Sequence, residues 1–135
     1  LESVKRCKNI HTSFLDQGIL YEYLRSGSFE RQIKKVRKVY KEKYELAVEC
    51  INKYINPTFI WGEGGLHIYI GIEGVDSRKL LDECYKKGVI FTPGDIFSVD
   101  YSCKNTLRLG LSRLSLNEIK EGIKIIGEVS KELRK

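Results

Sequence analysis

Apolar residues recur with the 3.6-residue period of an α-helix in four segments of the chain. Ser13 and Asp16 have the spacing of a helix start, and the apolar residues that follow predict a buried helix that stops at Ser26-Gly27. A much longer helix is predicted from about Phe29 to Tyr54, and Asn56-Pro57 ends it. Its single apolar stripe contains Ile33, Val36, Tyr40, Ala47, Ile51 and Tyr54.

Two shorter helices are predicted in the second half of the chain. One runs from about Ser77 to Lys87, with Gly88 in the left-handed position that follows a helix end. Its predicted buried residues are Leu80, Leu81, Cys84 and Tyr85. The other opens with Ser115 and Glu118, which have the spacing of a capping box. The apolar face of that helix continues through Ile123, Ile126, Val129 and Leu133.

Alternation of apolar and outward-facing residues predicts β-strands between these helices. After the break at Gly64-Gly65, a strand over 66–72 points His67, Tyr69 and Gly71 outward. Its inward residues are Leu66, Ile68, Ile70 and Ile72. Two short strands, 89–91 and 96–101, are predicted around a turn at 92–95. Together these elements predict an α+β fold, a small and largely antiparallel sheet covered by helices.

Arg108 is the most informative residue of one further strand, which covers residues 106–112. Leu107, Leu109 and Leu111 would face the core, so Arg108 projects from the opposite face, where its neighbours are the small residues Thr106, Gly110 and Ser112. A planar guanidinium with space beside it can bind a carboxylate through two parallel hydrogen bonds. The alternative is an arginine on a solvated sheet face, and alternation alone leaves both interpretations open.

The length of 135 residues, of which 41% are hydrophobic, is enough for one domain with a real core. The chain contains no methionine, even at its first position, and this suggests a fragment of a longer polypeptide. No apolar run approaches the roughly 20 residues that a membrane span requires. The first residues also lack the apolar centre of a secretory signal, so a soluble cytoplasmic protein without membrane association is expected.

A formal net charge of +6 is compatible with nucleic-acid binding. The basic residues along the long helix are Arg31, Lys34, Lys35, Lys38 and Lys41. Acidic residues alternate with them at spacings that allow i,i+4 pairing, and no aromatic stacking platform accompanies the basic stretch. A solvated helix face is therefore favoured over a nucleic-acid-binding module, and a protein-interaction domain is a third alternative.

The cysteines and histidines do not suggest a metal site. They are Cys7, Cys50, Cys84 and Cys103, with His11 and His67. The cysteines are widely separated and form no Cys-x-x-Cys pair, so a zinc site has little support. Cys50 and Cys84 occupy apolar helix positions, where a thiol behaves as a small hydrophobe, and all four cysteines are predicted to be reduced.

Several short motifs occur in an order and spacing that resemble one protein family. They are 65–69, 88–97, the strand that carries Arg108, and the helix start at 115–119. Because of these motifs, the chain resembles the C-terminal small domain of fold-type-I, pyridoxal-phosphate-dependent aminotransferases. The resemblance is strongest to the aminotransferase-like half of MocR/GntR transcriptional regulators and to 2-aminoadipate-aminotransferase-type enzymes. The chain departs from the usual pattern at Gln32, Lys34, Lys35 and Leu111.

The resemblance implies that Arg108 binds the α-carboxylate of an amino acid. It also implies that His67 and Phe97 line the substrate pocket. For each of these two there is an ordinary alternative, a hydrogen-bonded surface histidine and a packed core aromatic. The resemblance assigns no catalytic residue to this chain.

The family's Schiff-base lysine, phosphate-binding residues and ring-stacking aromatic lie in its large domain, and none matches a position here. Pyridoxal phosphate is therefore expected in the full-length protein and not on this chain alone, which should be inactive. The full-length protein is expected to be a homodimer. It is either a true aminotransferase or a regulator that binds DNA through an N-terminal winged-helix domain, and the resemblance favours the regulator.

The resemblance also suggests a boundary within the chain. Residues 1–27 resemble the end of the large cofactor domain, and residues 28–135 resemble the small domain, which begins with the long interdomain helix. Without the rest of the large domain, part of the apolar surface of the first helix should be uncovered. This predicts self-association or a loosely held N-terminal segment.

Overall fold

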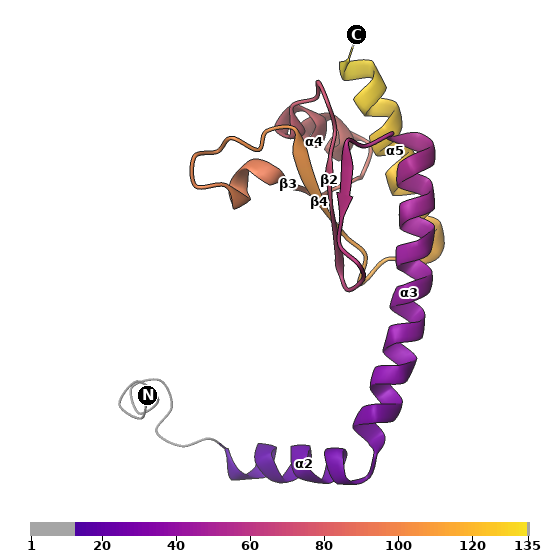
Figure 1. Cartoon of the computed structure of the whole chain (residues 1–135), viewed down its shortest axis with the longest axis vertical. Coiled ribbons are helices and arrows are strands. Elements are labelled where there is room, and N and C mark those ends of the chain that lie inside the picture. Colours follow the sequence, from indigo (N-terminus) through magenta and orange to yellow (C-terminus); the bar gives the residue numbers. More distant parts are fainter. Residues whose placement is uncertain (1–12, 135) are drawn as a thin grey trace. The chain divides into compact units, whose positions relative to one another are not determined.

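The computed structural model describes residues 13–134. The chain divides into two compact units that meet between Lys38 and Val39, inside the long helix α3 (Ser28–Tyr54). The described part of the first unit, residues 13–38, contains α2 (Phe14–Arg25) and the beginning of α3. The second unit contains the rest of α3 and all later elements (Figure 1). The boundary suggested at residues 27 and 28 stays a prediction.

Helix α2 begins and ends where the sequence predicts, but its apolar side chains are not buried. The Ser13 hydroxyl accepts a hydrogen bond from the Asp16 backbone N–H, and Gly27 has a φ of +68° just after the helix. Phe14 is 92% exposed and Leu15 is 71% exposed. Other exposed apolar residues of α2 are Ile19, Leu20, Tyr21, Tyr23 and Leu24. Within the described chain this helix therefore presents an uncovered apolar face. That a further domain covers this face stays a prediction.

We expect the chain to self-associate through this face of α2, because removing apolar surface from water is favourable. Sedimentation velocity should show an average mass that rises with protein concentration. A Leu15→Asp, Ile19→Asp double variant should remain monomeric, since each change places a charge on the contact surface. A wild-type chain that is monomeric throughout the series, with uniformly slow amide exchange across residues 14–24, would contradict this expectation.

The second unit is built on a four-stranded antiparallel sheet with strand order β1-β2-β4-β3. The strands are β1 (Phe59–Trp61), β2 (His67–Gly71), β3 (Thr92–Pro93) and β4 (Thr106–Gly110). Strand β4 pairs with β2 along its whole length and with β3 over two residues. The antiparallel sheet and the α+β class are therefore confirmed.

Three helices complete the core of the second unit: the C-terminal part of α3, α4 (Ser77–Lys86) and α5 (Leu116–Leu133). Figure 1 shows the C-terminal part of α3 and helix α5 next to the sheet. The inward residues of the two central strands, Ile68, Ile70, Leu107 and Leu109, are all buried. Residues at the alternate positions of these strands face away from the helices. This second sheet face carries Arg108.

The end of α3 and the middle of α5 approach each other closely at Gly127. A Cβ atom built on Gly127 would lie only 2.5 Å from the backbone oxygen of Tyr54. Glycine at this position therefore allows the two helices to pack with no side chain between them.

Two predicted strands are wrong. Residues 89–91 form no strand. The strand in this part of the chain is β3, at two residues for which the sequence predicted a turn. Residues 96–101 form no strand either. The chain turns instead into the 3-10 helix η1 (Gly94–Phe97), followed by bends.

Local hydrogen bonds explain why the segment after η1 is not a strand. The Ser98 backbone N–H donates to the Asp95 carbonyl oxygen at 3.2 Å. The Asp100 carboxylate accepts hydrogen bonds from the Ser98 hydroxyl and from the Ser102 backbone N–H. Short polar side chains of this kind offer the backbone partners that compete with a sheet. These hydrogen bonds also lower the pKa of Asp100 to about 2.

Three residues expected in the core are instead exposed or close to the surface. Leu66 is 44% exposed, Tyr85 is 66% exposed and Leu133 is 37% exposed. Each lies at or near the end of its strand or helix, where the periodic pattern continues but no neighbouring element covers the side chain.

The capping box at the start of α5 is present. The Glu118 backbone N–H donates to the Ser115 hydroxyl oxygen at 3.3 Å, and the Ser115 backbone N–H donates to the Glu118 carboxylate at 2.7 Å. The Ser115 hydroxyl, which donates to the same carboxylate, and the Ser115 backbone N–H together lower the pKa of Glu118. The sequence therefore determines this helix start correctly.

Replacing Ser115 by alanine should lower the free energy of unfolding by about 1 kcal/mol, because the helix loses its cap. Urea unfolding at neutral pH measures the loss. Ser112→Ala, at an exposed position before the helix, is the matched control and should change little. Since Glu118 has a lowered pKa when folded, its contribution is present above the ordinary glutamate pKa and is lost as the pH falls through the folded value. A loss that is the same at acidic and neutral pH would mean that the carboxylate has no part in the cap.

Candidate functional site

Arg108 projects from the centre of the sheet, on the face opposite the helices. Its neighbours Leu107 and Leu109 are 1% and 6% exposed, so the alternation predicted from the sequence is present. Tyr69 lies opposite Arg108 on β2, and Thr92 lies opposite it on β3. Because β4 has a neighbour on each side, the Arg108 side chain is half-buried between two strands.

An aromatic ring covers the guanidinium of Arg108. The central carbon of the guanidinium lies 4.8 Å from the centroid of the Phe97 ring, which is a favourable cation–π distance. Among residues 13–134, no carboxylate lies within ion-pair distance of Arg108, and no hydrogen bond to its guanidinium is formed. A half-buried arginine of this kind has its N–H donors available for an acidic ligand.

A pair of hydroxyl groups supports the sheet beside Arg108. The Tyr69 hydroxyl lies 2.6 Å from the Thr106 hydroxyl, which itself donates to the Cys103 carbonyl oxygen at 2.8 Å. Since threonine has a single O–H proton, Tyr69 is the donor in the first hydrogen bond. Gly94 packs directly against this pair, and a Cβ atom there would collide with the Thr106 hydroxyl. The close approach of η1 to the sheet therefore requires glycine at position 94.

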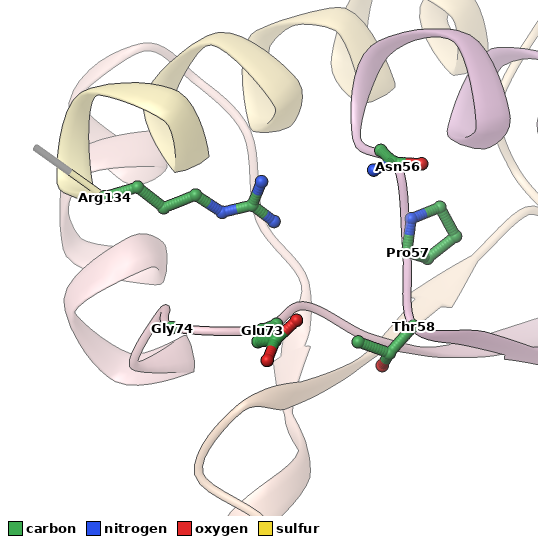
Figure 2. Close-up of a pocket in the computed structure, with 6 residues that line it drawn as sticks. All are labelled: Asn56, Pro57, Thr58, Glu73, Gly74 and Arg134. Carbon is green, nitrogen blue, oxygen red and sulfur yellow. The ribbon is translucent and has the colours of Figure 1, made fainter.

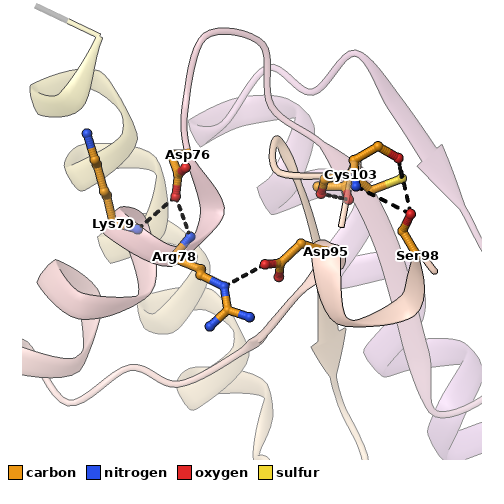
Figure 3. A network of polar contacts seen from close by, with 8 residues as sticks. Asp76, Arg78, Lys79, Asp95, Ser98 and Cys103 are labelled. Carbon is orange, nitrogen blue, oxygen red and sulfur yellow. Dashed lines mark hydrogen bonds and ion pairs between the residues drawn. The ribbon is translucent and has the colours of Figure 1, made fainter. Parts of the chain in front are cut away.

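The 3-10 helix η1 is also tied to α4 by an ion pair. Arg78 Nε donates to Asp95 Oδ2 at 2.5 Å, and Figure 3 shows the guanidinium beside this carboxylate. Asp95 is only 3% exposed, and the hydrogen bond raises the pKa of Arg78. The neighbouring Asp76 caps α4 by accepting from the Arg78 and Lys79 backbone N–H groups. Sequence analysis missed the Arg78–Asp95 pair, because 17 residues separate the two side chains.

The structure brings two of the three predicted site residues together. Phe97 contacts Arg108, as described above. His67 points to the same sheet face and pairs with Gly110, but it is exposed and lies two residues along β2 from the partner of Arg108. The pocket-lining roles of His67 and Phe97 stay predictions.

Sequence analysis missed an aromatic row that extends across the same face. It begins on β1 with Phe59 and Trp61, whose ring centroids are 5.1 Å apart. Trp61 stacks on Tyr69 with a centroid distance of 6.3 Å, and Tyr69 meets the edge of Phe97 at 6.2 Å. The signal in the sequence was the alternation Phe59-Ile60-Trp61, in which Ile60 faces inward opposite Ile70. This row places apolar surface beside the cation.

The described cysteines have the environment of structural thiols. Cys50 and Cys84 are buried and free, as predicted. Burial raises the pKa of both thiols, that of Cys84 to about 11, so neither forms a thiolate near neutral pH. Cys103 is free and half-buried, and Cys7 lies outside the described residues.

Most of the described basic residues of α3 are exposed to solvent. Lys34, Lys35 and Lys38 are exposed, and Lys41 forms an i,i+4 ion pair with Glu45. Lys43 instead donates to the backbone carbonyl oxygens that follow β4. This pattern agrees with the interleaved charges that favoured a solvated helix face.

A hollow of about 500 Å³ lies apart from Arg108. Figure 2 shows its lining residues, with the Arg134 side chain extended above Glu73. The other lining residues are Asn56, Pro57, Thr58 and Gly74. None of them belongs to the face that carries Arg108. Across residues 13–134 no group of histidine, cysteine and acidic side chains could hold a metal ion. Within the same residues no helix is both long and apolar enough to cross a membrane.

Comparisons with known sequences place this chain among aminotransferase-like proteins. An uncharacterized aminotransferase of Saccharolobus solfataricus is 34% identical over 97% of this chain, which corresponds to 33% of that protein. The HTH-type transcriptional regulator YdfD of Bacillus subtilis is 29% identical over 98% of this chain and 28% of its own length. The chain thus spans about a third of the length of the curated relatives it matches. No family model matches it.

A comparison with solved structures agrees with these relatives. The chain superposes on the kynurenine aminotransferase of Pyrococcus horikoshii with a TM-score of 0.88 and 32% identity. The match covers 99% of this chain and 34% of the enzyme, which was solved with its substrates and products.

Proposed function

Because this chain is homologous to fold-type-I aminotransferases and MocR/GntR-type regulators and has the fold of the aminotransferase small domain, we propose that it forms the carboxylate-binding wall of an amino-acid site. The observation that carries this proposal is the guanidinium of Arg108. It is half-buried at the centre of the sheet, lies over an aromatic ring and has no carboxylate partner among the described residues.

Arg108 has the geometry to bind and orient an amino acid. Two parallel N–H groups of a guanidinium match the two oxygens of a carboxylate, so the bound molecule is fixed in direction as well as position. The aromatic rings beside Arg108 exclude water from one side of such a contact, which strengthens it. Holding the carboxylate in this way fixes the amino group and the α-carbon relative to the rest of the site.

A pyridoxal phosphate cofactor would be held by other parts of a longer polypeptide. When bound, it supplies the electron sink for chemistry at the α-carbon. The residues described here do not fit as its holder, because no lysine among them is buried. Of the two half-buried lysines, Lys43 and Lys124, Lys43 binds backbone carbonyl oxygens. Other residues of the full-length protein would therefore have to supply the buried lysine that such a cofactor needs.

A genuine amino-acid aminotransferase is the first candidate for the full-length protein, because the aminotransferase of S. solfataricus is more similar to this chain than the regulator YdfD is. A regulator that uses an amino acid as an effector is the second candidate, and YdfD supports it. The sequence resemblance had favoured the regulator, and that interpretation stays a prediction. In both candidates Arg108 has the same role.

Assays of the full-length polypeptide loaded with pyridoxal phosphate separate the two candidates. L-Phenylalanine is the first amino acid to test, since the relative from P. horikoshii acts on kynurenine, which also has an aromatic side chain. Formation of phenylpyruvate with 2-oxoglutarate as the acceptor supports the enzyme. Amino-acid binding without turnover, together with steeply salt-dependent binding of DNA, supports the regulator. If no standard amino acid changes the cofactor absorbance, both candidates are wrong.

A further inference from the structure

We propose that Phe97 is a positioning residue for Arg108, and that the Arg78–Asp95 ion pair, which lies outside the carboxylate site, holds Phe97 in place. This inference rests on the carboxylate-binding role proposed above for Arg108. It adds two elements to that role: a ring that orients the guanidinium, and an anchor that fixes the ring.

The ring of Phe97 restrains the guanidinium without using its hydrogen-bonding groups. The guanidinium carbon lies over the ring, 4.8 Å from the ring centroid. The N–H groups of a guanidinium lie in its plane and point outward from its edge. A carboxylate from the chain itself would occupy those groups, whereas an aromatic ring leaves them free for a ligand. An arginine held over the ring also loses less side-chain freedom when the ligand binds.

The position of the Phe97 ring depends on how the short helix η1 is held, because Phe97 is not part of a strand. It is the last residue of the four-residue helix η1, and its side chain is 50% exposed. Its ring meets Tyr69 edge-on, with 6.2 Å between centroids and an interplanar angle of 74°. This aromatic contact sets the orientation of the ring but does not fix the backbone of η1.

Two contacts at the start of η1 supply the anchor. Gly94 packs against the Tyr69 and Thr106 hydroxyl groups, so the first residue of η1 lies directly on the sheet. The next residue, Asp95, is buried and bound to Arg78 of α4. Its second carboxylate oxygen is also buried, and no hydrogen-bond partner for it occurs among residues 13–134. Arg78 is therefore the principal partner of this buried charge, and removing it should displace η1 and the ring of Phe97.

The test compares L-phenylalanine with phenethylamine, which lacks the carboxylate but is otherwise the same molecule. The dissociation constant of each ligand is measured by titration of the cofactor absorbance of the full-length polypeptide. Phe97→Leu should raise the dissociation constant of L-phenylalanine by about 3- to 30-fold, the range expected when a cation–π contact is lost. The dissociation constant of phenethylamine should stay unchanged, because it has no carboxylate for Arg108. Phe97→Tyr keeps the ring and should restore binding of L-phenylalanine.

Ile96→Leu is the matched control for Phe97→Leu, since Ile96 lies in the same short helix and is also 50% exposed. It should leave both dissociation constants unchanged. If Phe97→Leu weakens the binding of both ligands equally, the ring does not act through the carboxylate and the proposal is wrong. The proposal is also wrong if Phe97→Tyr fails to restore binding of L-phenylalanine. The same conclusion follows if Ile96→Leu weakens binding as much as Phe97→Leu does.

The anchor is tested by Arg78→Met, with Lys79→Met as the control at the next position of α4. Lys79 is exposed, and only its backbone N–H takes part in the helix cap. Arg78→Met should raise the dissociation constant of L-phenylalanine by about two- to fivefold. The effect is modest because Arg78 itself is largely exposed. Arg78→Met should leave the dissociation constant of phenethylamine unchanged. Lys79→Met should leave the dissociation constants of both ligands unchanged. Unchanged binding of L-phenylalanine by Arg78→Met would show that the ion pair does not hold Phe97.

A parallel Arg108→Lys titration separates failure of this inference from failure of the proposed function. If Arg108→Lys weakens binding of L-phenylalanine while Phe97→Leu has no effect on this binding, Arg108 binds the carboxylate but Phe97 does not position Arg108. If Arg108→Lys has no effect, both proposals are wrong.

Discussion

Arg108→Lys is expected to weaken binding of L-phenylalanine to the full-length polypeptide by about 10- to 100-fold, the range for losing a hydrogen bond to a charged group. Lysine keeps the positive charge but has a single ammonium group, so it cannot form the two parallel hydrogen bonds of a guanidinium. The substitution also removes the guanidinium that lies over the Phe97 ring. Titration of the cofactor absorbance measures the effect.

Two comparisons make the Arg108→Lys result specific. Phenethylamine, which has no carboxylate, should bind the variant and the wild-type protein equally well. Arg113→Lys is the matched control protein, because Arg113 follows β4 closely and is exposed to solvent. An unchanged titration of L-phenylalanine by Arg108→Lys would remove the assignment of Arg108 as the carboxylate-binding residue.

Gly127→Ala is expected to lower the free energy of unfolding by about 2 kcal/mol, within the range seen when a well-packed core is overfilled. The added Cβ atom would lie 2.5 Å from the Tyr54 backbone oxygen and 2.8 Å from the Tyr54 carbonyl carbon. Backbone atoms at the end of a helix cannot rotate away as a side chain can. Helices α3 and α5 would therefore have to move apart, which opens the core at Ile51 and Ile126.

Gly122→Ala in the same helix is the control for this prediction. No atom lies within 4 Å of a Cβ atom built on Gly122. Alanine should raise stability there by about 0.5–1 kcal/mol, because it is a better helix former than glycine. Urea unfolding of both variants gives the two changes directly. If Gly127→Ala stabilises the protein as much as Gly122→Ala does, the two helices are not in close contact at this position.

The helix boundaries and the orientation of Arg108 could be predicted from the sequence because they depend on neighbours a few residues away. The caps at Ser13 and Ser115 bind backbone groups three residues later. Gly88 has a φ of +78°, the left-handed conformation predicted after the end of α4. The side chain of Arg108 points away from the core because the leucines on either side of it point inward.

The segment from Gly94 to Tyr101 could not be predicted because its conformation depends on distant partners. The apolar residues Ile96, Phe97 and Val99 have high strand propensity, which explains the incorrect strand. Their neighbour Asp95 binds Arg78, an interaction that no local pattern shows. Intrinsic strand propensity is weak and yields to such tertiary contacts.

By itself, the sequence determined the α+β class, the principal helices, the two central strands and an arginine that faces away from the core, since each depends on periodicity or on hydrogen bonds within one helix turn. The tertiary structure alone decided what surrounds that arginine: the register that places Tyr69 opposite it, the ring of Phe97 over it, and the ion pair that anchors η1. These contacts join segments 11 to 39 residues apart in the sequence numbering. The entropic cost of closing a loop changes only slowly with the length of the loop, so the distance between two residues in the sequence does not reveal whether they are partners. The packing of the whole unit decides which residues pair.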